Sequence, residues 1–219
     1  MTEFIQGFFL SDAVRNQNKG EVQFTLGVDS RRGLGTNTVL QTEYGLTNRL
    51  QLNFAMPYGF TGGKDSEVAA SWSTASLGFQ YQIIRSDTPF ALSAGMAIGV
   101  PVKPNSRLKY EPTILAAKTF RKLQVHASFL ADVEQWQPSL QYNVASVYPV
   151  RRRWFPTCEF NGRRFDSKNA FYLTPGLYRH FERRLEMGLG VPLGLGGVAG
   201  PIGVIAKVNW EFGGEHEDN

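Results

Sequence analysis

Cysteine and long apolar runs are the two features that this 219-residue chain lacks most clearly. A single cysteine, Cys158, excludes an intramolecular disulfide framework. No apolar stretch approaches the roughly 18 uninterrupted residues that a membrane-spanning helix needs. These absences exclude a bundle of membrane helices. They leave a membrane β-barrel possible, because only one face of a barrel strand is apolar.

Three histidines and one cysteine provide no metal-ligand spacing, so neither a metal nor a cofactor is predicted. The net charge of +4 would suit a nucleic-acid partner, but the basic residues lie at turns instead of along one stripe, so none is predicted. The first ten residues, MTEFIQGFFL, have neither the basic start nor the long apolar core of a secretory signal. A location in the cell envelope is therefore predicted from the strands alone.

Strict alternation of apolar and polar residues is the dominant pattern after residue 19. Residues 21–29 (EVQFTLGVD) and 50–56 (LQLNFAM) place apolar side chains on one face and mainly polar ones on the other. The same pattern predicts twelve strands, at 20–28, 37–44, 50–58, 70–83, 90–101, 111–121, 123–133, 138–148, 154–161, 169–180, 185–194 and 202–212. An even number of strands of about ten residues predicts an all-β fold, a transmembrane antiparallel up-and-down barrel.

The connections between these strands fall into two classes. Every second one is a tight or charged turn, such as Gly45–Asn48 or Arg121–Lys122. The others are mostly longer and rich in Gly, Ser, Asn and Pro, as at 59–69, 102–110 and 162–168. Short turns at one rim and longer loops at the other are typical of outer-membrane barrels, with the short turns on the periplasmic side.

Aromatic residues gather beside the short turns, as expected of a belt at the membrane interface. The belt is predicted to contain Tyr44, Tyr81, Phe90, Phe120, Tyr148, Trp154, Tyr178, Trp210 and Phe212. The polar face of the strands is rich in small residues, for example Ser93, Gly95 and Gly99. Such side chains suit a crowded lumen better than a solvated exterior, so the apolar face is predicted to contact outer-membrane lipid.

One segment resembles a known family. Residues 43–58 (EYGLTNRLQLNFAMPY) combine a Tyr-Gly-Leu-Thr-Asn-Arg turn with a strand that ends in Pro-Tyr. This resembles the outer-membrane family described as the putative meta-pathway of phenol degradation, or simply as a transporter. The opening residues 19–24 and the close at Trp210–Phe212 are also similar. The resemblance implies an outer-membrane barrel with a transport role and no established catalytic residues.

On a barrel, the alternation directs a set of charged or titratable side chains into the lumen: Glu21, Glu43, Lys118, His126, Asp132, Glu159, Glu186, Lys207 and Glu211. Carboxylates outnumber cations in this set. Two readings stay open at this point. The carboxylates either tune a water-filled lumen toward cations or form ion pairs and hydrogen bonds that fill a closed interior.

Three functions follow in order of preference. The first is an outer-membrane channel for small solutes or ions with an acidic lumen, and the second is a closed barrel that anchors an envelope assembly. The third is a hydrolase built on His126, Ser128 and Asp132, although residues two apart on a strand are poorly placed for proton transfer. Cys158 is expected to face lipid as a small apolar residue.

The chain is predicted to divide into a periplasmic or plug segment at 1–18, a barrel at 19–212 and a polar tail at 213–219. The run Arg151, Arg152 and Arg153 lies at a predicted periplasmic turn. Two readings stay open there: the run contacts anionic headgroups or an acidic protein partner, or it consists of solvated turn charges.

Overall fold

The computed structural model describes residues 5, 7–32, 35–61, 69–72, 74–85, 89–102, 107–134, 137–151, 153–182, 184–200 and 202–214. These residues form one sheet of fourteen strands. None of them belongs to a helix long and apolar enough to cross a membrane. The strands are β1 (Glu21–Arg31), β2 (Gly35–Gly45), β3 (Leu50–Thr61), β4 (Ala69–Trp72), β5 (Thr74–Ile84), β6 (Phe90–Pro101), β7 (Lys109–Phe120), β8 (Leu123–Glu134), β9 (Gln137–Val147), β10 (Trp154–Phe165), β11 (Lys168–Glu182), β12 (Leu185–Gly190), β13 (Leu193–Gly197) and β14 (Gly203–Gly213).

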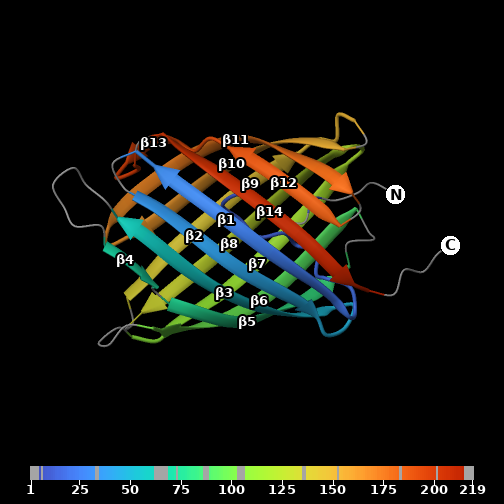
Figure 1. Ribbon diagram of the computed structural model, residues 1–219, viewed down its shortest axis with the longest axis horizontal. Coiled ribbons are helices and arrows are strands. Elements are labelled where there is room, and N and C mark those ends of the chain that lie inside the picture. The colour runs from blue at the N-terminus through green and yellow to red at the C-terminus, as the bar shows by residue number, and fades with distance from the viewer. Residues whose placement is uncertain are drawn as a thin grey trace.

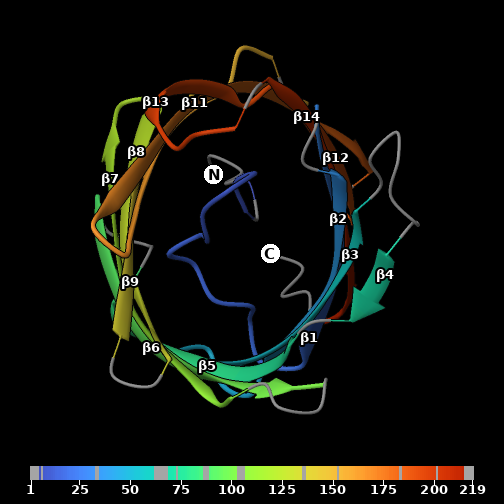
Figure 2. The same ribbon diagram turned by 90° about the vertical axis from the view of Figure 1, so that its left-hand side faces the viewer.

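The sheet closes on itself through the pairing of its first and last strands. β1 pairs with β2 on one side and with β14 on the other, from Glu21–Gly213 to Arg31–Gly203. β4 pairs only with the end of β3, and β12 and β13 follow one another along β11. The wall therefore has twelve positions, all antiparallel. Figure 1 shows its tilted strands from the side, and Figure 2 shows the wall as a ring. The predicted twelve-strand barrel is confirmed.

Two predicted strands are interrupted in the structure. The strand expected at 70–83 is divided into β4 and β5, and only β5 belongs to the barrel wall. The strand expected at 185–194 stops at Gly190 and resumes at Leu193. Pro192 causes the second break because its nitrogen carries no hydrogen to donate to a ladder. Its carbonyl still accepts a hydrogen bond from the Gly203 amide at 3.2 Å, which holds the wall together across the gap.

The barrel has two distinct rims. The rim at which β1 begins, at Glu21, is called the terminal end, and the rim at which β1 ends, at Arg31, is called the loop end. In Figure 1 these are the right and left sides. The loop end is tighter than the sequence indicates at one connection, since β10 and β11 are joined by Asp166 and Ser167 alone. Both residues have positive φ, 45° and 60°, the conformation of a two-residue hairpin turn.

The outer face is apolar and the inner face polar, the reverse of a soluble barrel. Leu77, Ile114 and Leu189 on the outer face are 64%, 57% and 63% exposed, whereas Gln23 and Glu159 on the inner face are 2% and 0% exposed. Exposed apolar side chains surround the outside of the wall, so this surface is suited to contact with the hydrocarbon of a bilayer.

A charge in the middle of the outer face tests the membrane orientation. Ile114 lies half-way along β7, whereas Val150, 60% exposed, lies in the turn between β9 and β10. Ile114→Arg is expected to lower the free energy of unfolding in phospholipid vesicles by about 2–4 kcal/mol, and Val150→Arg by about 1 kcal/mol or less. Urea titration of the refolded variants measures both values. Equal losses would contradict a hydrocarbon layer at Ile114.

Candidate functional site in the barrel lumen

The lumen is crossed by the chain's own residues 7–18, which we call the inner segment. Viewed along the barrel axis, this segment runs through the ring from the base of β1 to the opposite wall (Figure 2). Its side chains are mostly buried, with Phe8 and Val14 at 0% and 1% exposure. The segment forms no strand, so its backbone groups must find partners in the wall.

Glu159 on β10 is the principal anchor of the inner segment. Its carboxylate accepts hydrogen bonds from the amides of Phe9 at 2.6 Å and Leu10 at 3.0 Å, and from Ser11 Oγ at 3.4 Å. Lys207 Nζ on β14 donates to the carbonyl of Phe8 at 2.8 Å. A fully buried carboxylate is costly unless several donors satisfy it. The turn at residues 8–11 supplies these donors.

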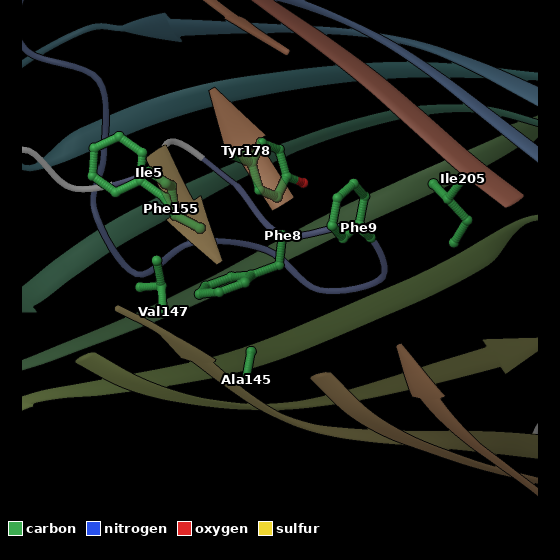
Figure 3. Packing of buried hydrophobic residues seen from close by; sticks show 8 residues of the cluster. All are labelled: Ile5, Phe8, Phe9, Ala145, Val147, Phe155, Tyr178 and Ile205. Carbon is green, nitrogen blue, oxygen red and sulfur yellow. The ribbon is translucent and has the colours of Figure 1, made fainter. Parts of the chain in front are cut away.

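Two phenylalanines fill the space beside this anchor. Phe9 stacks on Tyr178 with ring centroids 4.4 Å apart, and Phe8 meets the edge of His126 at 4.7 Å. Figure 3 shows both rings among wall residues from β9, β10, β11 and β14. Glycines in the facing wall make room for them, because a Cβ at Gly176 would overlap the Phe9 ring.

A second set of contacts holds the segment to the opposite wall. Val14 packs in one cluster with Ala91, Leu115 and Ala117 from β6 and β7. Its carbonyl accepts a hydrogen bond from Ser93 Oγ at 2.7 Å. The segment is therefore fixed on both sides of the lumen.

Amide side chains complete the attachment near β1, β3 and β5. The backbone N–H of Gln17 donates to Gln51 Oε1 at 2.7 Å. The side-chain Nε2 of Gln17 donates to Gln23 Oε1 at 2.8 Å and to Glu43 Oε2 at 3.3 Å. Gln80 Nε2 donates to Asn16 Oδ1 at 2.7 Å. Glu43 is thus a hydrogen-bond acceptor within this network.

Open space borders the middle of the inner segment. A cavity of about 580 Å³, called the outer vestibule, is bounded by Leu10 and by residues of β1, β9, β10 and β11 toward the loop end. A cavity of about 310 Å³ lies between the segment and β1, β2 and β14, and one of about 170 Å³ lies against β5, β6 and β7. Asp12 borders both smaller cavities.

The structure places most of the predicted lumen charges on the inner face. These are Glu21, Glu43, His126, Asp132, Glu159, Glu186, Lys207 and Glu211, each of which shares its strand face with buried neighbours. Their partners are mainly local. Glu186 Oε2 lies 2.5 Å from His180 Nε2, and Glu186 Oε1 accepts a hydrogen bond from Asn209 Nδ2 at 2.7 Å. Asp132 Oδ2 lies 3.5 Å from Lys109 Nζ.

Lys118 is a correction to the predicted set. Leu115 and Ala117 of β7 are buried in the lumen, so the alternation turns Lys118 outward. Its ammonium lies 5.0 Å from the centre of the Phe120 ring on the outer face. Lys118 is close to the end of its strand, where a long side chain can extend its charge toward the headgroups.

Tyr178 is a correction to the predicted belt. It is fully buried and faces the lumen against Phe9, because it alternates with inward-facing Thr174 and Gly176. The rest of the predicted belt lies on the outer surface and is exposed or partly exposed: Tyr44, Tyr81, Phe90, Phe120, Tyr148, Trp154, Trp210 and Phe212. Nearness to the terminal end was the basis of the prediction for Tyr178, whereas the strand face decides its direction.

The candidate hydrolase residues are not assembled for catalysis. Both ring nitrogens of His126 are buried with no hydrogen-bond partner in the described structure. Ser128 Oγ accepts from Asn143, and Asp132 pairs with Lys109. Within the same residues, no group of three or more His, Cys, Asp or Glu side chains could hold a metal. Cys158 is exposed on the outer face.

The arginine run is only partly described. Arg151 and Arg153 are exposed at the terminal end, and Arg153 donates to the carbonyl of Phe181 at 3.2 Å. Arg152 lies outside the described residues, as do residues 215–219 of the predicted tail. Contact of this run with headgroups or with a protein partner stays a prediction.

Sequence reasoning missed the residues of the wall that receive the inner segment. Gln51, Gln80 and Ser93 lie on the polar face and look like ordinary lumen residues. One signal was available: residues 4–10 are mostly apolar, with Phe8 and Phe9 adjacent, in a stretch without strand alternation. Such a stretch requires an apolar partner, and Gly176 and Gly190 mark where the wall has room for the Phe9 ring.

Comparisons with known proteins support the fold. No protein-family model and no curated protein sequence matches the chain. Solved structures with a similar fold include the COG4313 outer membrane channel from Pseudomonas putida F1, with a TM-score of 0.65, 13% identity and coverage of 96% of this chain and 100% of that one. The KdgM porin has a TM-score of 0.64 with 11% identity, covering 88% and 99% of the two chains. The NanC porin has a TM-score of 0.63 with 11% identity, covering 87% and 99%. The chain has the fold of porin-like outer-membrane barrels.

A pair of glycine substitutions tests the fit of the inner segment. A Cβ at Gly176 overlaps Phe9, whereas a Cβ at Gly196 meets no atom within 4 Å. Overpacking of this kind costs about 1–3 kcal/mol. Gly176→Ala is therefore expected to speed amide hydrogen exchange at residues 8–11 by roughly tenfold or more. Gly196→Ala should leave exchange there unchanged. Equal exchange in the two variants would show that Phe9 does not lie against Gly176.

Proposed function

We propose that the protein is an outer-membrane channel for small solutes, and that the inner segment is its movable barrier. One observation carries the proposal: a strandless segment crosses a polar lumen and is fixed on both sides, at Glu159 and at Ser93. The exposed apolar belt supports contact with outer-membrane lipid.

The contacts of the segment suit a barrier that can move. Many of its attachments are hydrogen bonds to polar wall groups, for example those from Gln80 and to Gln51, and water can replace them when the segment leaves. Its apolar contacts are confined to two patches, around Phe8 and Phe9 and around Val14. A segment attached in this way can open locally while the wall of paired strands stays intact.

The geometry favours one of the two readings of the lumen carboxylates. Glu159 holds the inner segment, Glu43 accepts from Gln17 and Gln41, and Glu186 accepts from Asn209. These side chains are engaged by protein donors, so we propose that they act mainly as a structural network. A cation preference would then arise at the carboxylates that border the open cavities, Asp12 and Glu111.

A closed barrel that serves an envelope assembly is the second candidate, because the inner segment fills the lumen between opposite walls. The two candidates differ in one property, whether the segment leaves the lumen. The KdgM porin was also solved in complex with disordered oligogalacturonate. At 11% identity this supports only the general idea that a barrel of this shape can admit a solute.

Reversible crosslinking of the inner segment to the wall tests the channel. In a Cys158→Ser background, cysteines at Val14 and Ala91 would be joined by a short bis-methanethiosulfonate, which forms a reducible disulfide to each of them with loss of methanesulfinate, since both residues lie in one cluster. In planar bilayers, the crosslinked protein is expected to lose conductance by at least about tenfold, and reduction is expected to restore it.

The matched control joins two residues of the wall. Leu92 and Ala116 are directly paired on the outer face of β6 and β7, away from the inner segment, so a crosslink between cysteines there leaves the segment free and conductance unchanged. A protein without residues 1–18 should conduct constantly if it refolds, which its migration on gels before and after heating shows. Absence of conductance in both the uncrosslinked protein and the refolded truncated protein would establish the closed barrel instead.

A further inference from the structure

The outer vestibule differs in charge from the rest of the lumen. Its lining contains Arg31, Arg163 and Lys168 and no carboxylate among the described residues. The cavity against β5, β6 and β7 has the opposite character, since it is lined by Asp12 and Glu111 and by no cation there. Positive and negative groups therefore lie on opposite sides of the lumen, and the outer vestibule is on the positive side.

Two of the three cations, Arg163 and Lys168, have no carboxylate partner among the described residues. Arg163 uses Nε to donate to Ser139 Oγ at 3.2 Å, and its two terminal nitrogens have no partner in the described structure. Lys168 forms neither a hydrogen bond nor an ion pair within the same part of the chain, and both side chains are exposed at the loop end. Unpaired cations that border a cavity with low-dielectric walls attract anions.

The third cation is fixed in position. Arg31 donates through Nε and Nη2 to Asp29 at 2.8–3.0 Å, and its guanidinium lies 4.4 Å above the centre of the Tyr172 ring. The Tyr172 hydroxyl accepts from the Gly200 amide at 2.8 Å, which ties the β13–β14 connection to β11. Arg31 and Tyr172 thus form a rigid border of the vestibule, although Asp29 offsets much of the Arg31 charge.

Amide side chains line the vestibule further inside. Asn161 donates to Asn143 Oδ1 at 2.9 Å, and Asn143 donates to Ser128 Oγ at 2.9 Å, so both amides are held in place. The side chain of Gln141 also lines the cavity and makes no hydrogen bond with the described residues. Amides both donate and accept, which is the property that recognises hydroxyl groups.

We infer that the outer vestibule binds small hydroxylated carboxylates, with the carboxylate at Arg163 and Lys168 and the hydroxyl groups at the amides below. Its volume of about 580 Å³ is in the range of small-molecule sites. As an assignment of solute class, the inference rests on the channel function proposed above. As a statement about binding, it is independent of whether the inner segment moves.

Calorimetric titration of the refolded, full-length protein in detergent at low ionic strength tests the binding. The probes are D-gluconate, which has both a carboxylate and hydroxyl groups, sorbitol, which has only hydroxyl groups, and butyrate, which has only a carboxylate. Gluconate is expected to bind with a millimolar dissociation constant, roughly tenfold more tightly than either of the others, and more weakly as salt is added.

Charge removal locates the site. Arg163→Gln and Lys168→Gln are each expected to weaken gluconate binding by about tenfold. Lys122→Gln, in the two-residue turn between β7 and β8 at the terminal end, is the control and should leave binding unchanged. Migration on gels before and after heating shows that each variant is folded.

Three results would overturn the inference: equal binding of gluconate and sorbitol, no gluconate binding at about 100 mM, or equal affinity in all three variants. These outcomes are separate from failure of the channel. Gluconate binding without any conductance would overturn the proposed function and keep the binding site. Conductance that depends on the crosslink, without gluconate binding, would overturn the binding site and keep the proposed function.

Discussion

Closure of the sheet between β1 and β14 is the constraint on which the rest of the structure depends. In a hydrocarbon layer every backbone amide and carbonyl of the wall must be paired within the protein, and only a closed barrel achieves this with strands. Twelve positions then fix the width of the ring, and that width is too large for wall side chains alone to fill near Tyr178 and Glu159. The inner segment occupies the remaining space. Whether the lumen is open there is therefore determined by the position of the inner segment and not by the wall.

The inner segment is held by chemistry that a barrel interior can provide. Its backbone amides have no ladder partners, and the buried carboxylate of Glu159 would be unstable without donors. The amides of Phe9 and Leu10 donate to the Glu159 carboxylate, so the hydrogen bonds that the segment needs and the donors that the carboxylate needs are the same contacts. The aromatic contacts of Phe8 and Phe9 add apolar burial on the same side. The carboxylates of the lumen have two environments: Glu43, Glu159 and Glu186 are engaged by protein donors, and Asp12 and Glu111 border open space.

The architecture could be predicted from the sequence because it depends on a local, repeated signal. Alternation over residues such as 21–29 and 50–56 specifies both the strand and the face that meets lipid. The errors arise where that signal competes with another. Tyr178 was assigned from its nearness to a turn, although its strand face decides its direction, and the alternation of β7 was assigned with the wrong face inward at Lys118. Pro192 interrupts a strand whose alternation continues across the break. The attachment of the inner segment could not be predicted, because the contact of Phe9 with Glu159 joins residues 150 positions apart and leaves no pattern in either stretch.

The central claim is that the inner segment lies in the lumen with its backbone on Glu159 when the protein is in a membrane. Solid-state NMR of the protein in phospholipid, with ¹⁵N in the phenylalanine amides and ¹³C in the glutamate side-chain carboxyl groups, measures this contact directly. We expect a dipolar coupling between the Phe9 nitrogen and the Glu159 carboxyl carbon that corresponds to about 4 Å or less, and we expect Glu159→Gln on its own or Phe9→Leu to remove it from the assigned spectrum. A Phe9 amide signal that shows no coupling to any carboxyl carbon would contradict it.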